Sequence, residues 1–238
     1  MTFAVILAGG KGTRMGNSEM PKQFLLLGDK PIMIHTIEQF LLNQQIDKII
    51  VCSPKEWIPY TNDILKKYLF NNDKVLVTQG GSTRNETILN GCMHIREKFG
   101  ASSEHIIITH DAVRPFITQR IINENIEAVK KYEVCDTVIG AIDTIIVSKD
   151  GEKIDEIPDR NFMFQGQTPQ SFGLEAFIDN YNSLTDKEKE ILTDACKIFI
   201  MKGKEVGCVK GDESNIKITN LYDLKIANAI VERNILND

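Results

Sequence analysis

The stretch that most constrains the fold runs from Ala4 to Lys22, with the sequence AVILAGGKGTRMGNSEMPK. It begins in an apolar run at residues 3–7, which has the length and composition of a fully buried strand. The run passes directly into a glycine-rich loop, whose small residues let backbone N–H groups approach an anion closely. Lys11, Arg14 and Lys22 add three positive charges around this loop. A buried strand followed by a cationic, glycine-rich loop predicts a phosphate-binding site.

Two common phosphate-binding loops are excluded by the order of the residues. In a Walker A loop the lysine after the last glycine is followed by Ser or Thr, whereas Lys11 is followed by Gly12. A dinucleotide-binding fingerprint that starts at Gly10 needs its third glycine at position 15, which is occupied by Met15. The phosphate compound is therefore expected to bind in another way.

Short apolar strands alternate with amphipathic helices along most of the chain. We expect further strands at residues 48–52, 75–78, 105–109, 136–139 and 206–209, and helices at 31–43, 57–70, 87–98, 119–132, 173–184, 186–192 and 221–233. This alternation predicts a three-layer, Rossmann-like α/β fold, in which helices cover both faces of a mainly parallel sheet. The length of 238 residues fits one large domain.

Residues 141–162 interrupt this alternation. Segments 141–148 and 153–157 flank a turn that contains Gly151, and together they predict a protruding β-hairpin arm. A two-stranded hairpin is only marginally stable alone. We therefore expect the arm to pack on a second copy of the chain, as in a homodimer.

Three unusual loops follow predicted strands, with the sequences LAGGKGTRMG, QGGSTRNET and HDAVRP. Each contributes one arginine, namely Arg14, Arg84 and Arg114. In parallel sheets, ligands bind beyond the carboxyl ends of the strands, where such loops meet. The three loops therefore predict one cationic site for an anionic ligand.

Composition narrows the classes of function. A net charge of −5 argues against a protein that coats nucleic acid. No apolar run approaches the ~20 residues that span a bilayer, and the N-terminus begins as a strand without a leader pattern, so we expect a cytosolic protein without a membrane partner. The five cysteines lack metal-ligand spacing, and each is expected to fill a core or half-buried site. Without HExxH or GxSxG, the sequence offers little basis for a hydrolase.

In chain order, LAGGKGTRMG, PKQF, GGSTRNET, HDAVRPF, DTI, QTPQSF, TDA and NIKIT resemble the motifs of the alditol and methylerythritol phosphate cytidylyltransferases. The resemblance covers almost the whole chain and implies transfer of CMP from CTP to a sugar-alcohol phosphate. The run at residues 165–171, the PF after HDAVR and the single arginine in IPDRN are most similar to the branch that uses D-ribitol 5-phosphate for teichoic acid or capsule synthesis. The branch that uses 2-C-methyl-D-erythritol 4-phosphate for isoprenoid synthesis is the alternative.

The resemblance also implies roles for individual residues. Arg14 and Lys22 are the expected catalytic residues, which stabilise the pentavalent α-phosphate. The residues expected to bind the nucleotide are Leu7, Ala8, Gly9, Gly10, Lys11, Gly81, Ser82, Arg84, Asn85, Thr87, Asp111 and Ala112. Asp111 is also expected to orient Mg²⁺, which accompanies CTP. The sugar phosphate is expected to contact Arg114, Thr144, Arg160 and Lys217, of which Thr144 and Arg160 are expected to reach the partner subunit's site.

Two further alternatives stay open on the sequence, and the first of them is from another class of function. A non-catalytic nucleotide-binding regulator is disfavoured because it would not need both phosphate-binding clusters. A hexose-phosphate uridylyl- or guanylyltransferase shares only the first loop. The expected functional partner is a reductase that supplies ribitol phosphate. Three other residues are expected to have structural roles or to lie near the site. His110 is expected to bond to backbone and Trp57 to pack, while Asp194 is expected either to cap a helix or to lie near the site.

Overall fold

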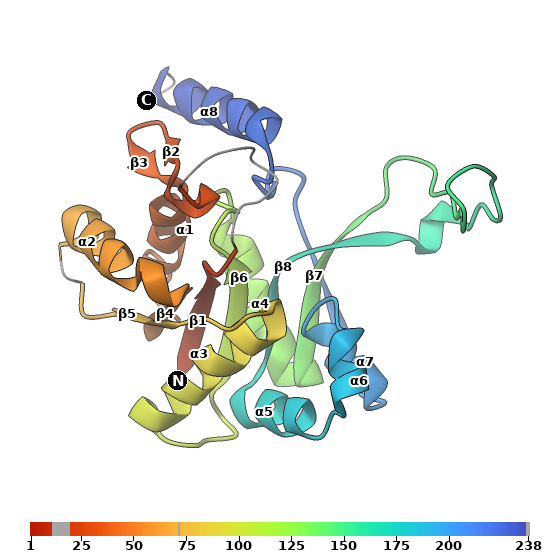
Figure 1. The fold of residues 1–238 in the computed structure, drawn as a ribbon, viewed down its shortest axis with the longest axis horizontal. Helices are drawn as coiled ribbons and strands as arrows, with labels where there is room; N and C mark the ends of the chain where they lie inside the picture. Colours follow the sequence, from red (N-terminus) through yellow and green to blue (C-terminus); the bar gives the residue numbers. More distant parts are fainter. Residues whose placement is uncertain (11–19, 71, 237–238) are drawn as a thin grey trace.

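A seven-stranded sheet forms the centre of this computed structural model, which describes residues 1–10, 20–70 and 72–236 (Figure 1). The strands stand in the order β5-β4-β1-β6-β8-β7-β9. β1, β4, β5 and β6 are mutually parallel, whereas β8 runs antiparallel to both of its neighbours. The bounds are β1 Thr2–Leu7, β4 Lys48–Ser53, β5 Val75–Gln79, β6 Ile106–Asp111, β7 Val134–Gly140, β8 Phe164–Gly173 and β9 Gly207–Lys210.

Helices cover both faces of the sheet because the inner strands are apolar on both sides. In β1, Phe3 and Val5 belong to one buried cluster, while Ala4 and Ile6 belong to another on the opposite face. The first face is covered by α3 (Arg84–Phe99), α5 (Leu174–Asn182) and α7 (Cys196–Met201). The second face is covered by α1 (Ile32–Leu41), α2 (Ile58–Leu69) and α4 (Gln119–Tyr132). The expected three-layer, mainly parallel α/β fold is confirmed.

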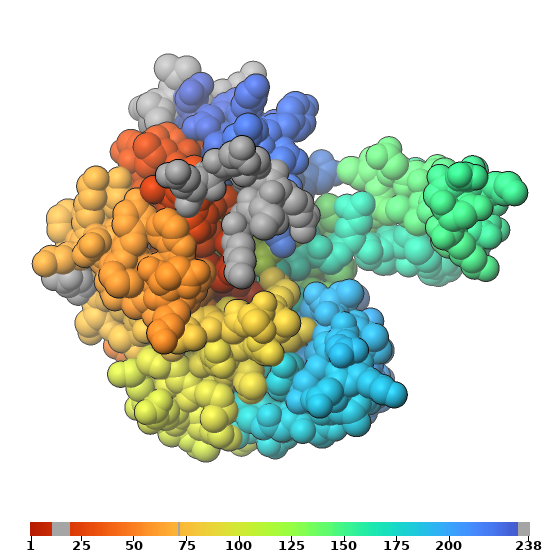
Figure 2. All heavy atoms as spheres, in the orientation of Figure 1, coloured from red at the N-terminus to blue at the C-terminus, as the bar shows by residue number. Residues whose placement is uncertain are grey.

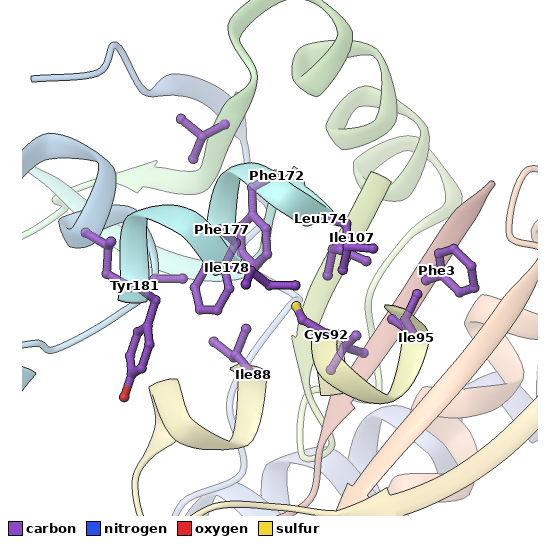
Figure 3. Close-up of a cluster of buried hydrophobic side chains, with 14 of the residues drawn as sticks. Phe3, Ile88, Cys92, Ile95, Ile107, Phe172, Leu174, Phe177, Ile178 and Tyr181 are labelled. Carbon is purple, nitrogen blue, oxygen red and sulfur yellow. The ribbon is translucent and has the colours of Figure 1, made fainter. Parts of the chain in front are cut away.

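Aromatic and branched side chains fill the first of these clusters, where α3 and α5 pack on the sheet (Figure 3). The rings of Phe172 and Phe177 stack with their centroids 4.6 Å apart. Ile88 and Cys92 of α3 are fully buried beside them. Each fully buried side chain of this size stabilises the fold by roughly 1.5–3 kcal/mol. The cluster therefore fixes α3, whose first turn enters the site described below.

The remaining elements are short, except for the last helix. They are η2 (Lys22–Phe24), β2 (Leu26–Leu27), β3 (Lys30–Pro31), η3 (Lys55–Trp57), η4 (Arg160–Phe162), α6 (Asp186–Glu190) and α8 (Leu221–Leu236). A third buried cluster joins α8 to β2 and to the segment after β6, through Ala227, Leu27 and Val113. Ile218 lies in the same cluster, and its backbone N–H donates to the Val113 carbonyl at 2.9 Å. The chain just before α8 is thereby held at the sheet edge.

Helix α3 begins earlier than the sequence predicts. The expected start was Thr87, but the helix begins at Arg84, because Thr83 caps it. The Thr83 hydroxyl accepts from the Glu86 backbone N–H at 3.1 Å, and the Glu86 carboxylate accepts from the Thr83 backbone N–H at 3.3 Å. This reciprocal capping box satisfies two N–H groups that would otherwise lack partners. As a result, Arg84 occupies the first helical turn rather than a loop.

The arm between β7 and β8 projects away from the body of the molecule (Figures 1 and 2). Its base is antiparallel, with Gly140 opposite Phe164. The prediction of two regular strands at 141–148 and 153–157 is wrong. The two segments are joined only by an isolated bridge between Val147 and Glu156. Along the arm, apolar side chains are exposed instead of packed, and a two-stranded ribbon without a packing partner is only marginally stable. They are Ile142, Ile146, Val147, Ile154, Ile157, Phe162 and Phe164.

Two further expectations concern the whole chain. Among the described helices, none is both long enough and apolar enough to cross a membrane. The five cysteines are free thiols, and four of them are buried as expected. Cys208 is exposed, because it lies on β9, the edge strand of the sheet.

Candidate functional site

A cavity of about 690 Å³ lies beyond the carboxyl ends of β1, β4, β5 and β6. It is lined by ten of the residues that the sequence singles out: Leu7, Gly9, Gly10, Lys22, Gly81, Ser82, Arg84, Thr87, Asp111 and Lys217. Four others are buried behind this lining, namely Ala8, Asn85, Ala112 and Arg114. Lys11 and Arg14 lie outside the described residues. The structure thus brings the second and third predicted loops together at one edge of the sheet, with the described start of the first.

Nine other lining residues carried no predicted role of their own. Gln23, Gln79, Gly80, Thr83 and Val113 belong to motifs named above, whereas the sequence reasoning missed Pro54, Lys55, Glu56 and Asn90. A signal for three of the missed residues was present. Pro54, Lys55 and Glu56 follow β4 directly, and the carboxyl ends of parallel strands share one edge. Without an arginine or glycine, this segment lacked the feature that marked the other loops.

The loop before α3 is shaped by the absence of a side chain at Gly81. A Cβ added there would lie 2.3 Å from the Cβ of Glu86 and 2.8 Å from the backbone nitrogen of Thr87. The Gly81 N–H donates to the Thr87 hydroxyl at 3.0 Å, and this hydroxyl donates to the Thr83 carbonyl at 2.8 Å. The loop therefore folds tightly onto the first turn of α3, beside the cavity.

Asp111, the last residue of β6, lies at the centre of a cationic cluster. Arg84 donates to one carboxylate oxygen, the Lys217 ammonium lies 2.9 Å from the other, and Arg114 Nε lies 3.5 Å from that second oxygen. Burial opposes ionisation of Asp111, but the three cations together hold its pKa well below the usual value. Asp111 is therefore ionised, and the cluster carries a net positive charge at the cavity wall.

A chain of hydrogen bonds fixes the backbone on either side of Asp111. The Asp111 N–H donates to the Thr168 hydroxyl at 3.2 Å, and His110 Nδ1 lies 3.0 Å from the same hydroxyl. His110 Nε2 lies 3.0 Å from the Arg114 carbonyl, which can only accept, so Nε2 carries the proton and Nδ1 accepts from Thr168. Burial lowers the pKa of His110 to about 4, so the ring is neutral. The expectation that His110 bonds to backbone is confirmed.

Asn215 joins the QTPQ and NIKIT segments to this cluster. Its amide nitrogen donates to the Thr168 carbonyl at 2.9 Å and to the Gln167 side-chain oxygen at 3.1 Å. The backbone carbonyl of Asn215 accepts from Arg114 Nη1 at 2.7 Å. Asn215 is fully buried. The two motifs therefore support Arg114 and, two residues after Asn215, Lys217.

The two arm residues do not reach the cavity of their own chain. Thr144 and Arg160 are both exposed, and Arg160 Nη1 donates to the Ile142 carbonyl within the arm at 2.6 Å. Neither residue lines the cavity. Their predicted contact with the sugar phosphate thus requires a second subunit.

Asp111 is the carboxylate that is expected from the sequence to orient a metal ion, and Glu56 is a second carboxylate in the described cavity lining. Among the described residues, no group of three or more His, Cys, Asp or Glu side chains could hold a metal ion. Mg²⁺ in phosphate-transfer sites commonly keeps several waters and binds one or two carboxylates together with substrate phosphates. Asp111 is ionised and faces the cavity, so it fits this mode.

Trp57 and Asp194 have structural roles. The ring of Trp57 packs against Phe24 and Tyr60 at centroid distances of 5.2 and 5.6 Å, as expected. Asp194 Oδ1 accepts from the Lys197 backbone N–H at 2.9 Å and thus caps the start of α7. Of the two open expectations for Asp194, capping is confirmed.

The arrangement suits the alignment of anions more than nucleophilic attack by the protein. Burial raises the pKa of the Cys52 and Cys135 thiols to about 12, so neither forms a thiolate near neutral pH. The described cavity instead presents the cations Lys22, Arg84 and Lys217. Such a site can bind several phosphate groups and stabilise charge that develops between them.

Comparison with known proteins identifies related sequences and folds. The model of the family described as "IspD: 2-C-methyl-D-erythritol 4-phosphate cytidylyltransferase" matches residues 2–233. The structure of 4-diphosphocytidyl-2C-methyl-D-erythritol synthase from Anaerococcus prevotii superposes with a TM-score of 0.79, at 26% identity over 97% of this chain and 98% of that chain. The 2-C-methyl-D-erythritol 4-phosphate cytidylyltransferase of Francisella tularensis gives a TM-score of 0.78, at 26% identity over 95% and 98%. The enzyme from Thermus thermophilus, 21% identical over 98% of this chain and all of that chain, shares the fold with a TM-score of 0.74.

Proposed function

The chain belongs to the 2-C-methyl-D-erythritol 4-phosphate cytidylyltransferase family and is a cytidylyltransferase, and we propose that it transfers CMP from CTP to D-ribitol 5-phosphate. The products are CDP-ribitol, a precursor for teichoic acid or capsule polymers, and pyrophosphate. The observation that carries the proposed chemistry is the convergence of Arg84, Arg114 and Lys217 on Asp111 at the cavity wall. A non-catalytic regulator is disfavoured, since the family consists of enzymes.

In the proposed reaction, a phosphate oxygen of the acceptor attacks the α-phosphorus of CTP, and the bond from that phosphorus to the bridging oxygen of pyrophosphate breaks. The acceptor is a phosphate monoester with a second pKa of ~6, so it is already an anion near neutral pH. A general base is therefore unnecessary, which agrees with a buried, neutral His110. The protein's task is to align two anions and to stabilise the transition state.

We assign the first glycine-rich loop to binding the phosphates of CTP, and above all the reacting α-phosphate. Arg14 and Lys22 stabilise the pentavalent phosphorus, and Lys11 contacts the outer phosphates. Lys22 lines the cavity together with Gly9 and Gly10, which supports the assignment. The backbone of residues 7–10 holds CTP, and the loop before α3 completes the nucleotide pocket, with Gly81 and Ser82 near the base.

Mg²⁺ is proposed to accompany CTP, held by Asp111 and the substrate phosphates. When bound, it neutralises phosphate charge and so assists departure of pyrophosphate. Asp111 holds Lys217 and Arg84 beside the cavity. These cations are consequently in place for both substrates.

The choice of ribitol phosphate as the acceptor rests on sequence motifs that differ within the family. The Gln165–Ser171 run, the PF after HDAVR and the single arginine of IPDRN are most similar to the ribitol phosphate branch. The buried Asn215 of NIKIT bonds to the Thr168 carbonyl of this run, and its backbone carbonyl accepts from Arg114. Arg114 and Lys217 are proposed to bind the acceptor phosphate.

The second candidate acceptor is 2-C-methyl-D-erythritol 4-phosphate, and the comparisons favour it over ribitol phosphate. The matching family and the Anaerococcus prevotii and Francisella tularensis structures, each 26% identical, carry the name of this substrate or of its product. With this acceptor the enzyme would serve isoprenoid synthesis. The nucleotide half of the site is the same for both candidates.

A homodimer is proposed, in which the arm of each subunit brings Thr144 and Arg160 to the site of the other. Two observations support this arrangement: the apolar side chains of the arm are exposed, and Arg160 is not among the residues that line the cavity of its own chain. A reductase that makes ribitol phosphate is the proposed functional partner, because the acceptor is a reduced sugar phosphate.

The test is pyrophosphate release from CTP and Mg²⁺ with each acceptor at equal concentration. Turnover on ribitol phosphate with the higher kcat/KM supports the first proposal. Turnover on methylerythritol phosphate alone overturns it and establishes the second.

A further inference from the structure

Gln170 lies at the point where three strands meet, deep beneath the cavity. It is 2% exposed, and in the sheet it stands opposite Thr109 of β6 and Asp136 of β7. The Thr109 hydroxyl donates to the Gln170 carbonyl at 2.7 Å. The backbone position of Gln170 is thus fixed, and only its side-chain amide can reorient.

The surroundings of this amide determine which end faces Arg84. Its oxygen accepts from the Ala195 backbone N–H at 3.3 Å and from Arg84 Nη2 at 3.5 Å. Its nitrogen is left to face Asp136, which stands opposite Gln170 in the sheet, and the Gln170 amide lowers the pKa of the Asp136 carboxyl. Arg84 Nη1 meanwhile donates to Asp111. One guanidinium is therefore held at two points, by Asp111 in the cavity and by Gln170 below it.

Asp136 is a half-buried carboxylate that the reaction does not use. Its Oδ1 is buried and has no hydrogen-bond partner among the described residues. Burial, and then the charge of Asp194, raise its pKa to about 6, although Gln170 and Arg84 act in the opposite direction. The other titratable groups that interact with it are Arg114, Cys135 and Cys196, and Cys208 stands opposite it on β9.

We propose that Gln170 is a positioning residue that holds the Arg84 guanidinium against Asp111, and that the Asp136 carboxylate fixes the Gln170 amide in the orientation this requires. The inference rests on the proposed role of Arg84 in the nucleotide site. An ionised Asp136 can only accept, so the amide nitrogen points toward it and the oxygen toward Arg84. A protonated Asp136 can donate, so the amide can turn and present its nitrogen to Arg84, where two donors repel each other.

The first experiment compares Gln170→Met, which keeps the volume and removes the amide, with the wild-type protein. We expect kcat to fall by about 10- to 100-fold, as for loss of a hydrogen bond to a charged group, with a smaller change in the KM for the acceptor. Gln44→Met is the matched control, since Gln44 is exposed and outside the cavity lining. An unchanged kcat in folded Gln170→Met overturns the proposal.

The second experiment uses pH to separate positioning from a merely structural role. Asp136→Asn resembles the protonated acid at every pH. The ratio of wild-type to Asp136→Asn kcat/KM should therefore rise about tenfold between pH 5 and pH 8, and the ionisation of the shared substrate cancels in this ratio. A ratio that does not change with pH contradicts the role of Asp136.

A third measurement keeps the inference testable if Gln170→Met does not fold or if neither acceptor is a substrate. In the double variant Asp136→Asn, Gln170→Glu, the new amide can donate to the new carboxylate, which can still accept from Arg84. Urea unfolding without ligand should show this variant to be more stable than Gln170→Glu alone, which places two carboxylates side by side. No gain in stability would contradict the assigned contacts, whereas silence with both acceptors would contradict only the proposed substrates.

Discussion

The Lys217 ammonium lies 2.9 Å from the Asp111 carboxylate, so the segment before α8 closes on the end of β6. Arg84 reaches the same carboxylate from the first turn of α3. Segments from three parts of the chain thus meet at one negative charge, and their cations remain directed at the cavity. This single carboxylate organises the site before any phosphate enters it.

Replacement of Asp111 by alanine should abolish turnover and weaken the fold. Arg114 is 9% exposed and would lose its only carboxylate partner among the described residues. We expect a loss of about 2–4 kcal/mol in the free energy of unfolding, since a buried cation would be left without its partner. Pyrophosphate should raise the melting temperature of Asp111→Ala more than that of the wild type, because an anion can replace the carboxylate. An equal rise in both proteins would contradict the account.

Replacement of Gly81 by alanine should impair nucleotide binding. The new methyl group would meet Glu86 and the Thr87 backbone at 2.3–2.8 Å, so the loop must move away from α3. We expect the Kd for CTP to rise by about tenfold or more, equivalent to at least ~1.4 kcal/mol. Gly173→Ala is the control, because its nearest neighbour would lie at an ordinary 3.6 Å. Calorimetric titration with CTP measures both, and equal affinities would refute the assignment of this loop.

His110 and Asp136 should have opposite effects on how the free energy of unfolding changes with pH. The pKa of His110 is about 4 in the fold and ~6.5 when unfolded, so its contribution to stability falls as the pH drops from 6.5 to 4. The pKa of Asp136 is about 6 in the fold and ~3.9 when unfolded, so its contribution rises over the range from pH 6 to 4. The two slopes have similar size and opposite sign.

The Asp136→Asn variant should show the pH dependence of stability that His110 contributes, because the opposing contribution of Asp136 is removed. Between pH 6 and pH 4, the free energy of unfolding of this variant should fall by about 1.4 kcal/mol per pH unit relative to the wild type. Urea unfolding across this pH range measures the difference. Parallel pH profiles for the two proteins would show that Asp136 does not titrate in this window.

Mixed dimers test whether the arm serves the other subunit. Arg160→Ala and Asp111→Ala should each be nearly inactive alone. When they are refolded together, half of the dimers are mixed, and each mixed dimer has one intact site if Arg160 acts across the interface. The mixture should then recover roughly a quarter of the wild-type rate. No recovery in dimers shown to be mixed would mean that Arg160 acts in its own chain.

Much of the site was predictable from local sequence. The apolar run of β1 and the loops after β5 and β6 each carry a signal that depends only on neighbouring residues, and parallel topology places their ends at one edge. The loop after β6 also predicted Arg114 as a cation of the site, whereas Lys217 was predicted from the resemblance alone, and the structure brings both to Asp111. Arg160 was also predicted from the resemblance, but within one chain it bonds only to the arm itself among the described residues.

Strand β8 shows why other parts were not predictable. Its sequence FQGQTPQSFG contains Pro169 and several polar side chains, which argue against a central strand. The sheet tolerates Pro169 because the pairing of β7 with β8 is interrupted between Val138 and Asp136, where the register shifts. The polar side chains are buried because distant residues such as Asn215 bond to them. Both reasons depend on tertiary contacts that local patterns do not contain.

The most direct test of the account measures pyrophosphate release by the wild-type protein from CTP and Mg²⁺. Reactions contain D-ribitol 5-phosphate, 2-C-methyl-D-erythritol 4-phosphate or no acceptor. The account predicts release that requires an acceptor, with the higher kcat/KM on ribitol phosphate, and its loss in Asp111→Ala. Release without any acceptor, or none with either acceptor, would contradict the central claim that this site joins CTP to a sugar-alcohol phosphate.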